Sequence, residues 1–160
     1  MLLEGNMRDK DFLNKTVISM ADGAVIGKVK DLVLHDLDFS SLVVNGERGE
    51  GLLPFSSIGK NGPDAIMIES YTVVDWNAGR SLVPGTQTTH DLRKLSVVDG
   101  QGNMLGHIAE FAMNSKGHIH EFIVRTEGVF GIGAQETVVP QSKVRAIGSE
   151  VITVEAETKK

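Results

Sequence analysis

Two histidines late in the chain have the spacing that most directly suggests chemistry. His118 and His120 are two positions apart, so on a β-strand their side chains project from the same face. Imidazole nitrogens bind divalent metals, and Glu121 or His107 could complete such a site. Gly117 and His118 together also have the composition of a hairpin tip, where a histidine simply faces water. We therefore keep metal binding as an alternative and assign no metal site.

Acidic and hydroxyl residues offer little for catalysis. Asp31 and Glu110 each follow a glycine in an apolar run by four residues. Paired carboxylates can perform acid–base catalysis, but a repeated structural unit explains the match equally, with the acids accepting hydrogen bonds from loop amides or facing water. Ser56, Ser57 and Ser142 lack the G-x-S-x-G turn that exposes a nucleophile. We predict a protein that is not an enzyme and uses no cofactor.

The most unusual segment is the glycine-rich stretch 127–136. It lacks the Lys-Ser/Thr pair of a phosphate-binding loop. We interpret it as a hairpin that displays Val129, Phe130 and Ile132 to a protein partner, because apolar side chains on a loop tip mark partner surfaces. The alternative is that these side chains fold back as a lid over the rest of the protein. Trp76 is likewise either a packing residue between two halves or a partner-binding anchor.

Charge and hydropathy exclude several classes of partner. The chain of 160 residues has a formal net charge of −5, and its basic residues are dispersed. Binding to the phosphate backbone of nucleic acids needs clustered Lys and Arg, so we predict no direct nucleic-acid contact. No apolar run is long enough for a transmembrane helix and no signal-peptide pattern is present. We expect a cytoplasmic protein, and peripheral association with a membrane complex stays open. The absence of cysteine excludes disulfides and thiolate metal sites.

An internal repeat dominates the organisation of the chain. Residues 25–32 and 104–111 agree in residue class at seven of eight positions, and their glycines Gly27 and Gly106 are 79 residues apart. At the same spacing, the following pairs align: Asp22-Gly23 with Gln101-Gly102, Ile18 with Val97, and Val43-Val44 with Phe122-Ile123. Further on, Leu52-Leu53-Pro54 aligns with Val138-Val139-Pro140 at a spacing of 86. The second copy therefore carries seven additional residues, which fall around 127–136.

Each copy has the pattern of a small barrel, with five or six short strands separated by frequent turns. Asp22-Gly23 predicts a hairpin turn of type I′, and Gly102 predicts a hairpin turn at the matching place in the second copy. Gly27 and Gly106 lie inside strands and predict barrel corners. Pro54 and Pro140 close their strands, because proline cannot donate to the ladder. No segment has the periodicity of a long helix. Ser56-Ser57 offers an N-cap for a single short helical turn that ends near Gly59.

The stretch 70–91 matches neither copy. Residues 71–76 are expected to extend the last strand, and residues 84–89 are polar and turn-prone. We predict a first barrel over 1–76, a linker over 77–91 and a second barrel over 92–160. Because each half is small and buries only a modest core, we expect the halves to pack on one another or the protein to form homo-oligomers.

These features resemble the PRC-barrel family in their order, spacing and duplication. The resemblance covers residues 13–70 and 92–156. It implies an all-β fold of two tandem small PRC-like β-barrels packed together and used as interaction modules. Related barrels form the cytoplasmic part of the photosynthetic reaction-centre H subunit and a domain of the ribosome maturation factor that contacts a ribosomal protein. The chain is more similar to the stand-alone tandem proteins of bacteria.

We predict a non-catalytic adaptor that binds a protein through sheet edges and the 127–136 segment. Two alternatives stay open. The first is an RNA-processing or ribosome-associated role through a ribosomal protein. The second is a small-ligand or metal-binding module that uses His118 and His120.

Overall fold

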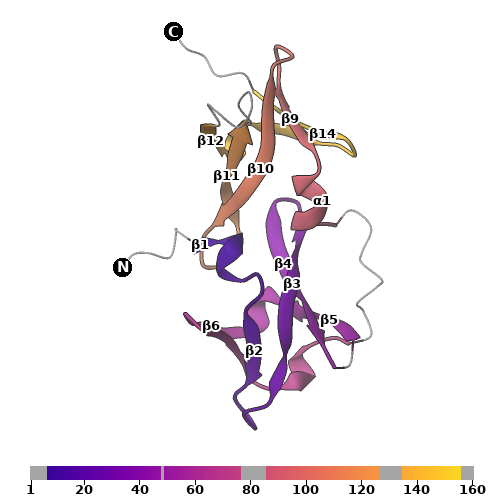
Figure 1. Cartoon of the computed structure of the whole chain (residues 1–160), viewed down its shortest axis with the longest axis vertical. Helices are drawn as coiled ribbons and strands as arrows, with labels where there is room; N and C mark the ends of the chain where they lie inside the picture. Colours follow the sequence, from indigo (N-terminus) through magenta and orange to yellow (C-terminus); the bar gives the residue numbers. More distant parts are fainter. Residues whose placement is uncertain (1–6, 48, 77–85, 127–134, 156–160) are drawn as a thin grey trace.

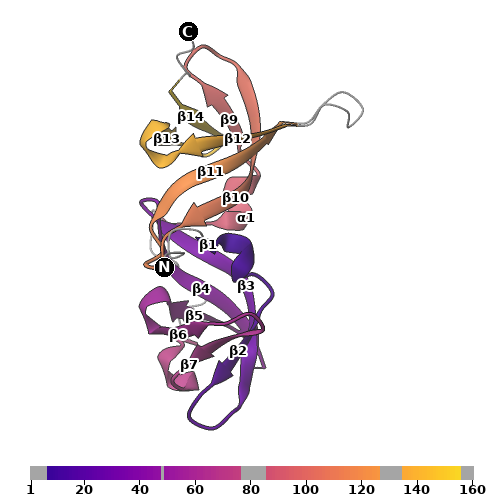
Figure 2. The same cartoon turned by 90° about the vertical axis from the view of Figure 1, so that its left-hand side faces the viewer.

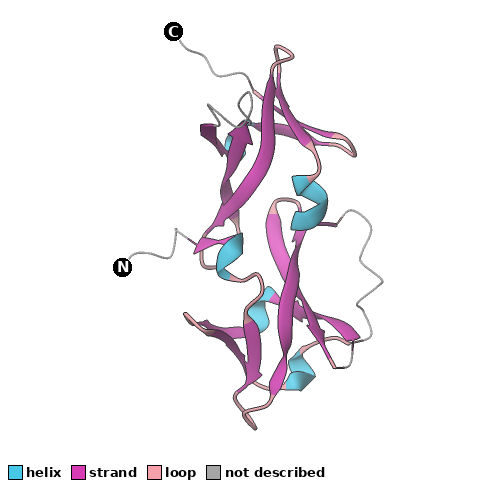
Figure 3. Cartoon of the chain, in the orientation of Figure 1, coloured by secondary structure: helices cyan, strands magenta, loops and turns pink. Residues whose placement is uncertain are grey.

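The computed structural model describes residues 7–47, 49–76, 86–126 and 135–155, and these are built almost wholly from β-strands (Figure 3). Two seven-stranded sheets lie one above the other along the long axis of the molecule (Figure 1). Each sheet curls on itself, so that the molecule consists of two small barrels in contact (Figure 2). The predicted all-β fold of two tandem barrels packed together is therefore confirmed.

The first sheet has the strand order β5-β4-β3-β2-β7-β6, with β8 paired to β3. Its strands are β2 (Thr16–Ser19), β3 (Val25–His35), β4 (Asp38–Gly46), β5 (Gly49–Pro54), β6 (Ile58–Asn61), β7 (Ala65–Ile68) and β8 (Gln87–Thr88). All neighbours are antiparallel except β2 and β7. A single helical turn is present as η3 (Phe55–Ser57), but Ser56 and Ser57 lie within it, and its N-cap is Pro54, without a side-chain hydrogen bond. The predicted serine cap and the predicted end near Gly59 are therefore wrong. The helical turn η4 (Tyr71–Val73) follows β7.

The second sheet repeats this topology, with the order β12-β11-β10-β9-β14-β13 and β1 paired to β10. Its strands are β1 (Met7–Arg8), β9 (Ser96–Asp99), β10 (Met104–Met113), β11 (Ile119–Thr126), β12 (Gln135–Pro140), β13 (Val144–Ile147) and β14 (Val151–Val154). The helices η2 (Asp9–Asp11), α1 (Thr89–Arg93) and η5 (Gln141–Lys143) complete the described elements. The repeat seen in the sequence is thus a repeat of strand order.

The two barrels exchange their first short strands. β1 precedes the first copy in the chain but pairs with β10 of the second, with Arg8 opposite Ala112. β8 precedes the second copy but pairs with β3 of the first, with Thr88 opposite Val33. The predicted linker, 77–91, therefore contains β8 and the start of α1, and the exchange crosses the predicted boundaries. Each barrel is completed by a strand from the other half.

In the structure, β2 and β9 correspond with a shift of one residue from the alignment predicted by the sequence repeat. Val97 lies opposite Gly106 on β10, and the residue opposite Gly27 on β3 is Val17 rather than Ile18. Val17 and Val97 are both buried, so these two valines occupy the same place in their barrels. The predicted pairing of Ile18 with Val97 is wrong because neighbouring apolar residues hide a shift of one position.

The alignment of β4 and β11 also shifts. Val43 lies opposite Asp31, and Ile123 lies opposite Glu110. Val43 therefore corresponds to Ile123 and not to Phe122, as the repeat predicted. The shift arises because the chain from Glu110 to its partner Ile123 is one residue longer than the chain from Asp31 to its partner Val43.

The type I′ turn that was predicted at Asp22-Gly23 occurs instead between β3 and β4. Asp36 and Leu37 have φ angles of 51° and 68°, as both central residues of a type I′ turn require. At the predicted position, Gly23 has a positive φ of 72° but Asp22 does not. The type I′ prediction at Asp22 is therefore wrong, and the chain there forms a longer loop between β2 and β3. In the second copy Gly117, with φ 86°, closes the longer β10–β11 turn.

Gly27 and Gly106 lie where one strand crosses very close to the next. A Cβ atom on Gly27 would lie 2.5 Å from the backbone oxygen of Asn45, and one on Gly106 would lie 2.1 Å from that of Arg125. Register shifts next to both glycines bend their strands. Any larger residue at these two positions would force the strands apart, which explains glycine inside both long strands.

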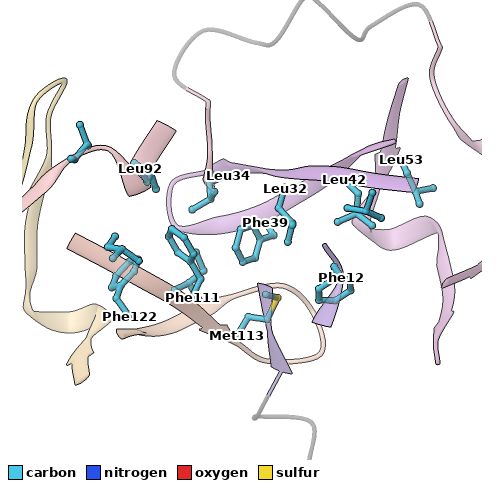
Figure 4. Packing of buried hydrophobic residues seen from close by; sticks show 14 of the residues in the cluster. Phe12, Leu32, Leu34, Phe39, Leu42, Leu53, Leu92, Phe111, Met113 and Phe122 are labelled. Atoms are coloured by element: carbon cyan, nitrogen blue, oxygen red, sulfur yellow. The ribbon is translucent and has the colours of Figure 1, made fainter. Parts of the chain in front are cut away.

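A single apolar core runs through both barrels. Phe39 of β4 meets Phe111 of β10 edge to face, with ring centroids 5.9 Å apart, and Phe111 meets Phe122 at 5.6 Å (Figure 4). Phe12 and Leu92, from the segments that follow the exchanged strands, are fully buried in the same cluster. The packing of the two halves on one another, predicted from their small size, is confirmed.

Candidate interaction surfaces

The matched acids Asp31 and Glu110 lie at the junction between the barrels. Each follows a register shift, in β3 or in β10. Asp31 accepts hydrogen bonds from the Thr89 hydroxyl and, at 3.4 Å, from the His90 N–H. Glu110 forms an ion pair with Arg8 and a second one, at 3.2 Å, with Lys10. All these partners belong to or directly follow the exchanged strands, so both acids hold the exchanged segments in place.

The environment of Glu110 favours its charged form. Partial burial acts to raise the pKa of this carboxyl group, but hydrogen bonds and charges from Arg8 and Lys10 outweigh burial and lower the pKa below its usual value of 4.5. The carboxylate is therefore an ionic anchor. A general acid at neutral pH would need a raised pKa instead.

A buried ion pair completes the junction. The Asp9 side chain is 0% exposed, forms an ion pair with Arg93 and accepts a 3.0 Å hydrogen bond from the Phe111 N–H. Arg93 also donates to the Ala109 carbonyl at 3.1 Å, and its guanidinium group lies 5.4 Å from the centre of the Phe111 ring. The charge of Asp9 is thus fully compensated inside the protein.

This ion pair was not predicted from the sequence, although a shared pattern marks the two short helices in which Asp9 and Arg93 lie. The tetrapeptides 9–12 and 89–92, Asp-Lys-Asp-Phe and Thr-His-Asp-Leu, share an acid followed by a large apolar residue. In both, that acid accepts a hydrogen bond from the backbone N–H at the start of the helix, in a capping box. Extending the repeat toward its N-terminal side would have revealed the two equivalent segments.

The two histidines considered for metal binding have separate surroundings. The Nδ1 atom of His118 shares a hydrogen bond with a carboxylate oxygen of Asp38 of β4, and the His118 backbone forms an isolated antiparallel bridge with the same residue. The Nδ1 atom of His120 lies 3.9 Å from Glu121 Oε1. His107 is opposite Arg125, at the other end of β11. Across 7–47, 49–76, 86–126 and 135–155, no three His, Asp or Glu side chains form a group that could hold a metal ion.

Two open grooves flank the junction at matching places. One, of about 380 Å³, lies between Leu37 in the β3–β4 turn and Arg145 on β13. The other, of about 470 Å³, lies between Ser115 in the β10–β11 turn and Lys60 on β6. Each groove thus separates an edge strand of one barrel from a hairpin tip of the other, and both carry polar and apolar side chains without a cluster of titratable groups.

In the first barrel, the segment 74–76 covers the edge strand β5. Leu52 and Asp75 exchange two backbone hydrogen bonds, 3.0 Å from Leu52 N to Asp75 O and 2.8 Å from Asp75 N to Leu52 O. Val74 is buried, and a Cβ atom on Gly51 would lie 2.7 Å from both Val74 Cγ1 and Trp76 Cε3. The prediction that residues 71–76 extend the last strand is wrong: β7 ends at Ile68, and η4 turns the chain onto β5.

Trp76 consequently packs on its own barrel. Its ring lies against the β5 backbone, and its indole Nε1 has no hydrogen-bond partner among the residues that the structure describes. Beside it lies a shallow pocket of about 260 Å³, which Tyr71, Asp22 and Glu47 also line. The described neighbours of this ring all belong to the first barrel.

In the second barrel, the equivalent strand β12 is bare within the described part of the chain. It ends the sheet, and no described strand pairs with its outer side. Val138, the counterpart of Leu52, is 53% exposed. Next to it lies a groove of about 100 Å³ whose apolar walls are formed by Leu105, Val138, Val139 and Val154. Among the described residues, the two barrels therefore differ at this edge: the first is covered and the second is open.

The residues predicted to bind a partner in the 127–136 segment, Val129, Phe130 and Ile132, lie outside the described residues. The described pair closest to them is Thr126 with Gln135, where β11 and β12 begin to pair. The segment thus leads directly into the open edge strand. No helix in the described ranges is long and apolar enough to cross a membrane.

Comparison with known proteins supports the repeat. A family described as PRC-barrel domain matches the chain twice, at residues 4–74 and 85–159. The two matches cover most of the chain, and each contains one copy of the strand order described above. A search of curated proteins found no match.

Proposed function

The chain belongs to the PRC-barrel family, in a tandem form, and from this premise we propose that it is a non-catalytic module that binds another protein. The observation that carries the proposal is the difference between the two equivalent edges. Exposed sheet edges attract further strands, and proteins normally cover or charge them. Here β5 is covered by the chain itself, whereas β12 presents an exposed valine beside an apolar groove.

The candidate catalytic groups bind other parts of the same protein, and this supports a non-catalytic role. Asp31 and Glu110 bind the exchanged segments, and Asp9 is paired with Arg93 at the junction. His118 is paired with Asp38. These groups act in the architecture, and a rigid two-barrel unit is suited to presenting a surface to a partner. The resemblance to bacterial tandem proteins is our reason for placing this function in the bacterial cytoplasm.

Cross-linked affinity purification from the native cells tests this function. The bait is the full chain, and bound proteins are identified by mass spectrometry. Val138→Lys places a charge on the open edge, and Met104→Lys is the matched control, because Met104 is 62% exposed on β10 and is not one of the groove residues. We expect one dominant protein that is lost with Val138→Lys and kept with Met104→Lys.

A second bait tests the 127–136 segment. The double substitution Phe130→Ser, Ile132→Ser removes two of its apolar side chains while leaving β12 unchanged. Loss of the same partner would assign the segment to the binding surface. Capture of no specific protein by any bait, or a turnover by the purified protein that a point substitution abolishes, would contradict the proposed function.

A further inference from the structure

The first barrel shows how an added segment can lie on this edge of the sheet. Residues 74–76 lie on β5 as an added antiparallel segment, with Asp75 opposite Leu52. Leu52 lies opposite Val43 on β4, and Val138 lies opposite Ile123 on β11. Since Val43 and Ile123 are equivalent, Leu52 and Val138 occupy the same place in their sheets.

The backbone of Val138 points outward. Residues along an antiparallel pair alternate between those that bond to the neighbouring strand and those that face away. Leu52 faces away from β4, because its N–H and C=O both bond to Asp75. Pro140, two residues from Val138, has the same orientation, and a proline is tolerated there because no ladder bond is needed. Val138 therefore offers one donor and one acceptor at the open edge.

The groove beside Val138 suits a side chain of an added segment. In the first barrel, Val74 is buried in the core, and Trp76 lies against the β5 backbone and lines a pocket together with Ile26. In the second barrel the corresponding space is bounded by Leu105 and Val154, and it stays open as the apolar groove of about 100 Å³. An added strand would place one side chain of apolar character in this groove.

One position differs between the edges and restricts what fits. Gly51 lies against Trp76, and a Cβ atom on Gly51 would collide with the ring at 2.7 Å. Its counterpart in the second barrel is Thr137, which is exposed and carries the Cβ that the glycine lacks. The same Cβ position lies 2.7 Å from Val74 Cγ1, so neither Val74 nor Trp76 could lie on β12 as it lies on β5. The indole is the larger and more rigid of the two, so a smaller residue suits its place.

We propose that β12 binds an extended segment of a partner protein as an added antiparallel strand. The segment carries a polar residue opposite Val138, flanked by two apolar residues, of which the second is smaller than tryptophan. Backbone hydrogen bonds supply affinity in this mode, and the groove supplies specificity. The inference rests on the proposed function and adds to it the place and the chemistry of the partner.

Two synthetic peptides probe the edge directly. One has the sequence of residues 70–76, Ser-Tyr-Thr-Val-Val-Asp-Trp, and the other has valine in place of the tryptophan. Binding to the full chain is measured by calorimetry, and the backbone amide signals of Val138 and Leu52 are followed by NMR. We expect the valine peptide to bind at least tenfold more tightly than the tryptophan peptide, and to move the signal of Val138 but not that of Leu52.

Three variants sharpen the test. Val138→Pro removes the outward donor without removing a bond to β11, and should weaken binding at least tenfold. Val138→Thr keeps the donor and the approximate shape, and should bind more tightly than the proline variant. Thr137→Gly reproduces the surface of β5, and should tighten binding of the tryptophan peptide at least tenfold. Circular dichroism and thermal unfolding establish that each variant is folded.

The outcomes separate this inference from the proposed function. If folded Val138→Pro binds the valine peptide as tightly as the unchanged chain, strand addition is overturned. If neither peptide binds the unchanged chain or Thr137→Gly, while affinity purification still recovers a protein that Val138→Lys loses, strand addition is overturned and the adaptor function stands. If purification recovers no partner, the adaptor function itself fails, whatever the peptides do.

Discussion

A buried charge is stable only where its partners surround it, and Asp9 is such a residue. Its carboxylate has an ion pair with Arg93 and a hydrogen bond from the Phe111 N–H, and it is fully buried. Removing one member of a buried pair leaves the other without compensation, which typically costs about 3–5 kcal/mol. The stability of the junction therefore depends on this side chain more than on any exposed ion pair.

We predict that Asp9→Ala lowers the free energy of unfolding by about 3 kcal/mol or more. Arg93 loses its counter-charge, and the Phe111 N–H loses its acceptor. Urea unfolding followed by circular dichroism measures the change, and Asp64→Ala, in an exposed turn, serves as the control for a lost carboxylate. A loss below about 1 kcal/mol, comparable to an exposed pair, would contradict the role of Asp9.

Glu110 makes the stability depend on pH in a definite direction. Its pKa in the folded protein is lowered below 4.5, the value expected for the unfolded chain. Its stabilising contribution is therefore complete above the unfolded pKa and is lost as the pH falls through the folded pKa. We expect Glu110→Gln to be less stable than the unchanged chain at pH 7, by about 1 kcal/mol or less because both cations are partly exposed.

The pH profile of that difference distinguishes charge from packing. The unfolding free energies of the two proteins should converge as the pH falls below 4.5 and through the lower pKa of Glu110 in the folded protein, because the carboxyl group then becomes protonated in both states. Chemical unfolding at a series of pH values provides the comparison. A difference that stays constant down to pH about 2 would assign the effect to shape rather than to ionisation.

At the scale of elements, the close crossings at Gly27 and Gly106 determine how the long strands bend. Gly106 has φ 127°, and a Cβ there would meet the Arg125 carbonyl oxygen at 2.1 Å. We predict that Gly106→Ala lowers the free energy of unfolding by at least about 2 kcal/mol, because backbone must move to admit the methyl group. Gly100→Ala is the matched control: a Cβ there meets nothing within 4 Å, and its φ is not in the positive range. Equal stability of the two variants would contradict the close-approach account.

The elements also show what the sequence could and could not predict. The short strands, a helical turn near Ser56-Ser57 and the duplication followed from residue class and spacing, whereas the order of the strands in the sheets did not. The I′ turn was assigned to Asp22-Gly23, yet Asp36 and Leu37 adopt it, held in place where the Leu37 carbonyl accepts a 3.1 Å hydrogen bond from the Ile119 N–H of the other barrel. A contact between segments distant in sequence leaves no local pattern.

The candidate site divides in the same way. The resemblance and the repeat predicted that sheet edges matter, but which edge is open depends on where residues 74–76 lie. Local pattern favoured continuation of β7, whereas the chain turns at η4 and pairs with β5. That choice is made by burial of Val74 and Trp76 against Gly51, a tertiary contact. Alignment of Gly51 with Thr137 would have shown only that the two edges differ.

At the scale of the whole molecule, the exchanged strands and the continuous core make the two barrels interdependent. β1 cannot leave the second barrel without disturbing η2 and Phe12, and β8 is linked in the same way to α1 and Leu92. We predict a single unfolding transition in differential scanning calorimetry, with equal calorimetric and van't Hoff enthalpies. Two resolved transitions would mean that the barrels fold independently.

Residues 74–76 cover β5, whereas no described strand pairs with the outer side of the equivalent strand β12, to which we propose a partner binds. Native-state hydrogen exchange of the free protein, read by NMR at the amides of Leu52 and Val138, tests this claim most directly. We expect the Leu52 amide, which is bonded to the Asp75 carbonyl, to exchange at least a hundredfold more slowly than the Val138 amide. Equal protection of the two amides would mean that the β12 edge is already covered in the free chain, and would contradict the account.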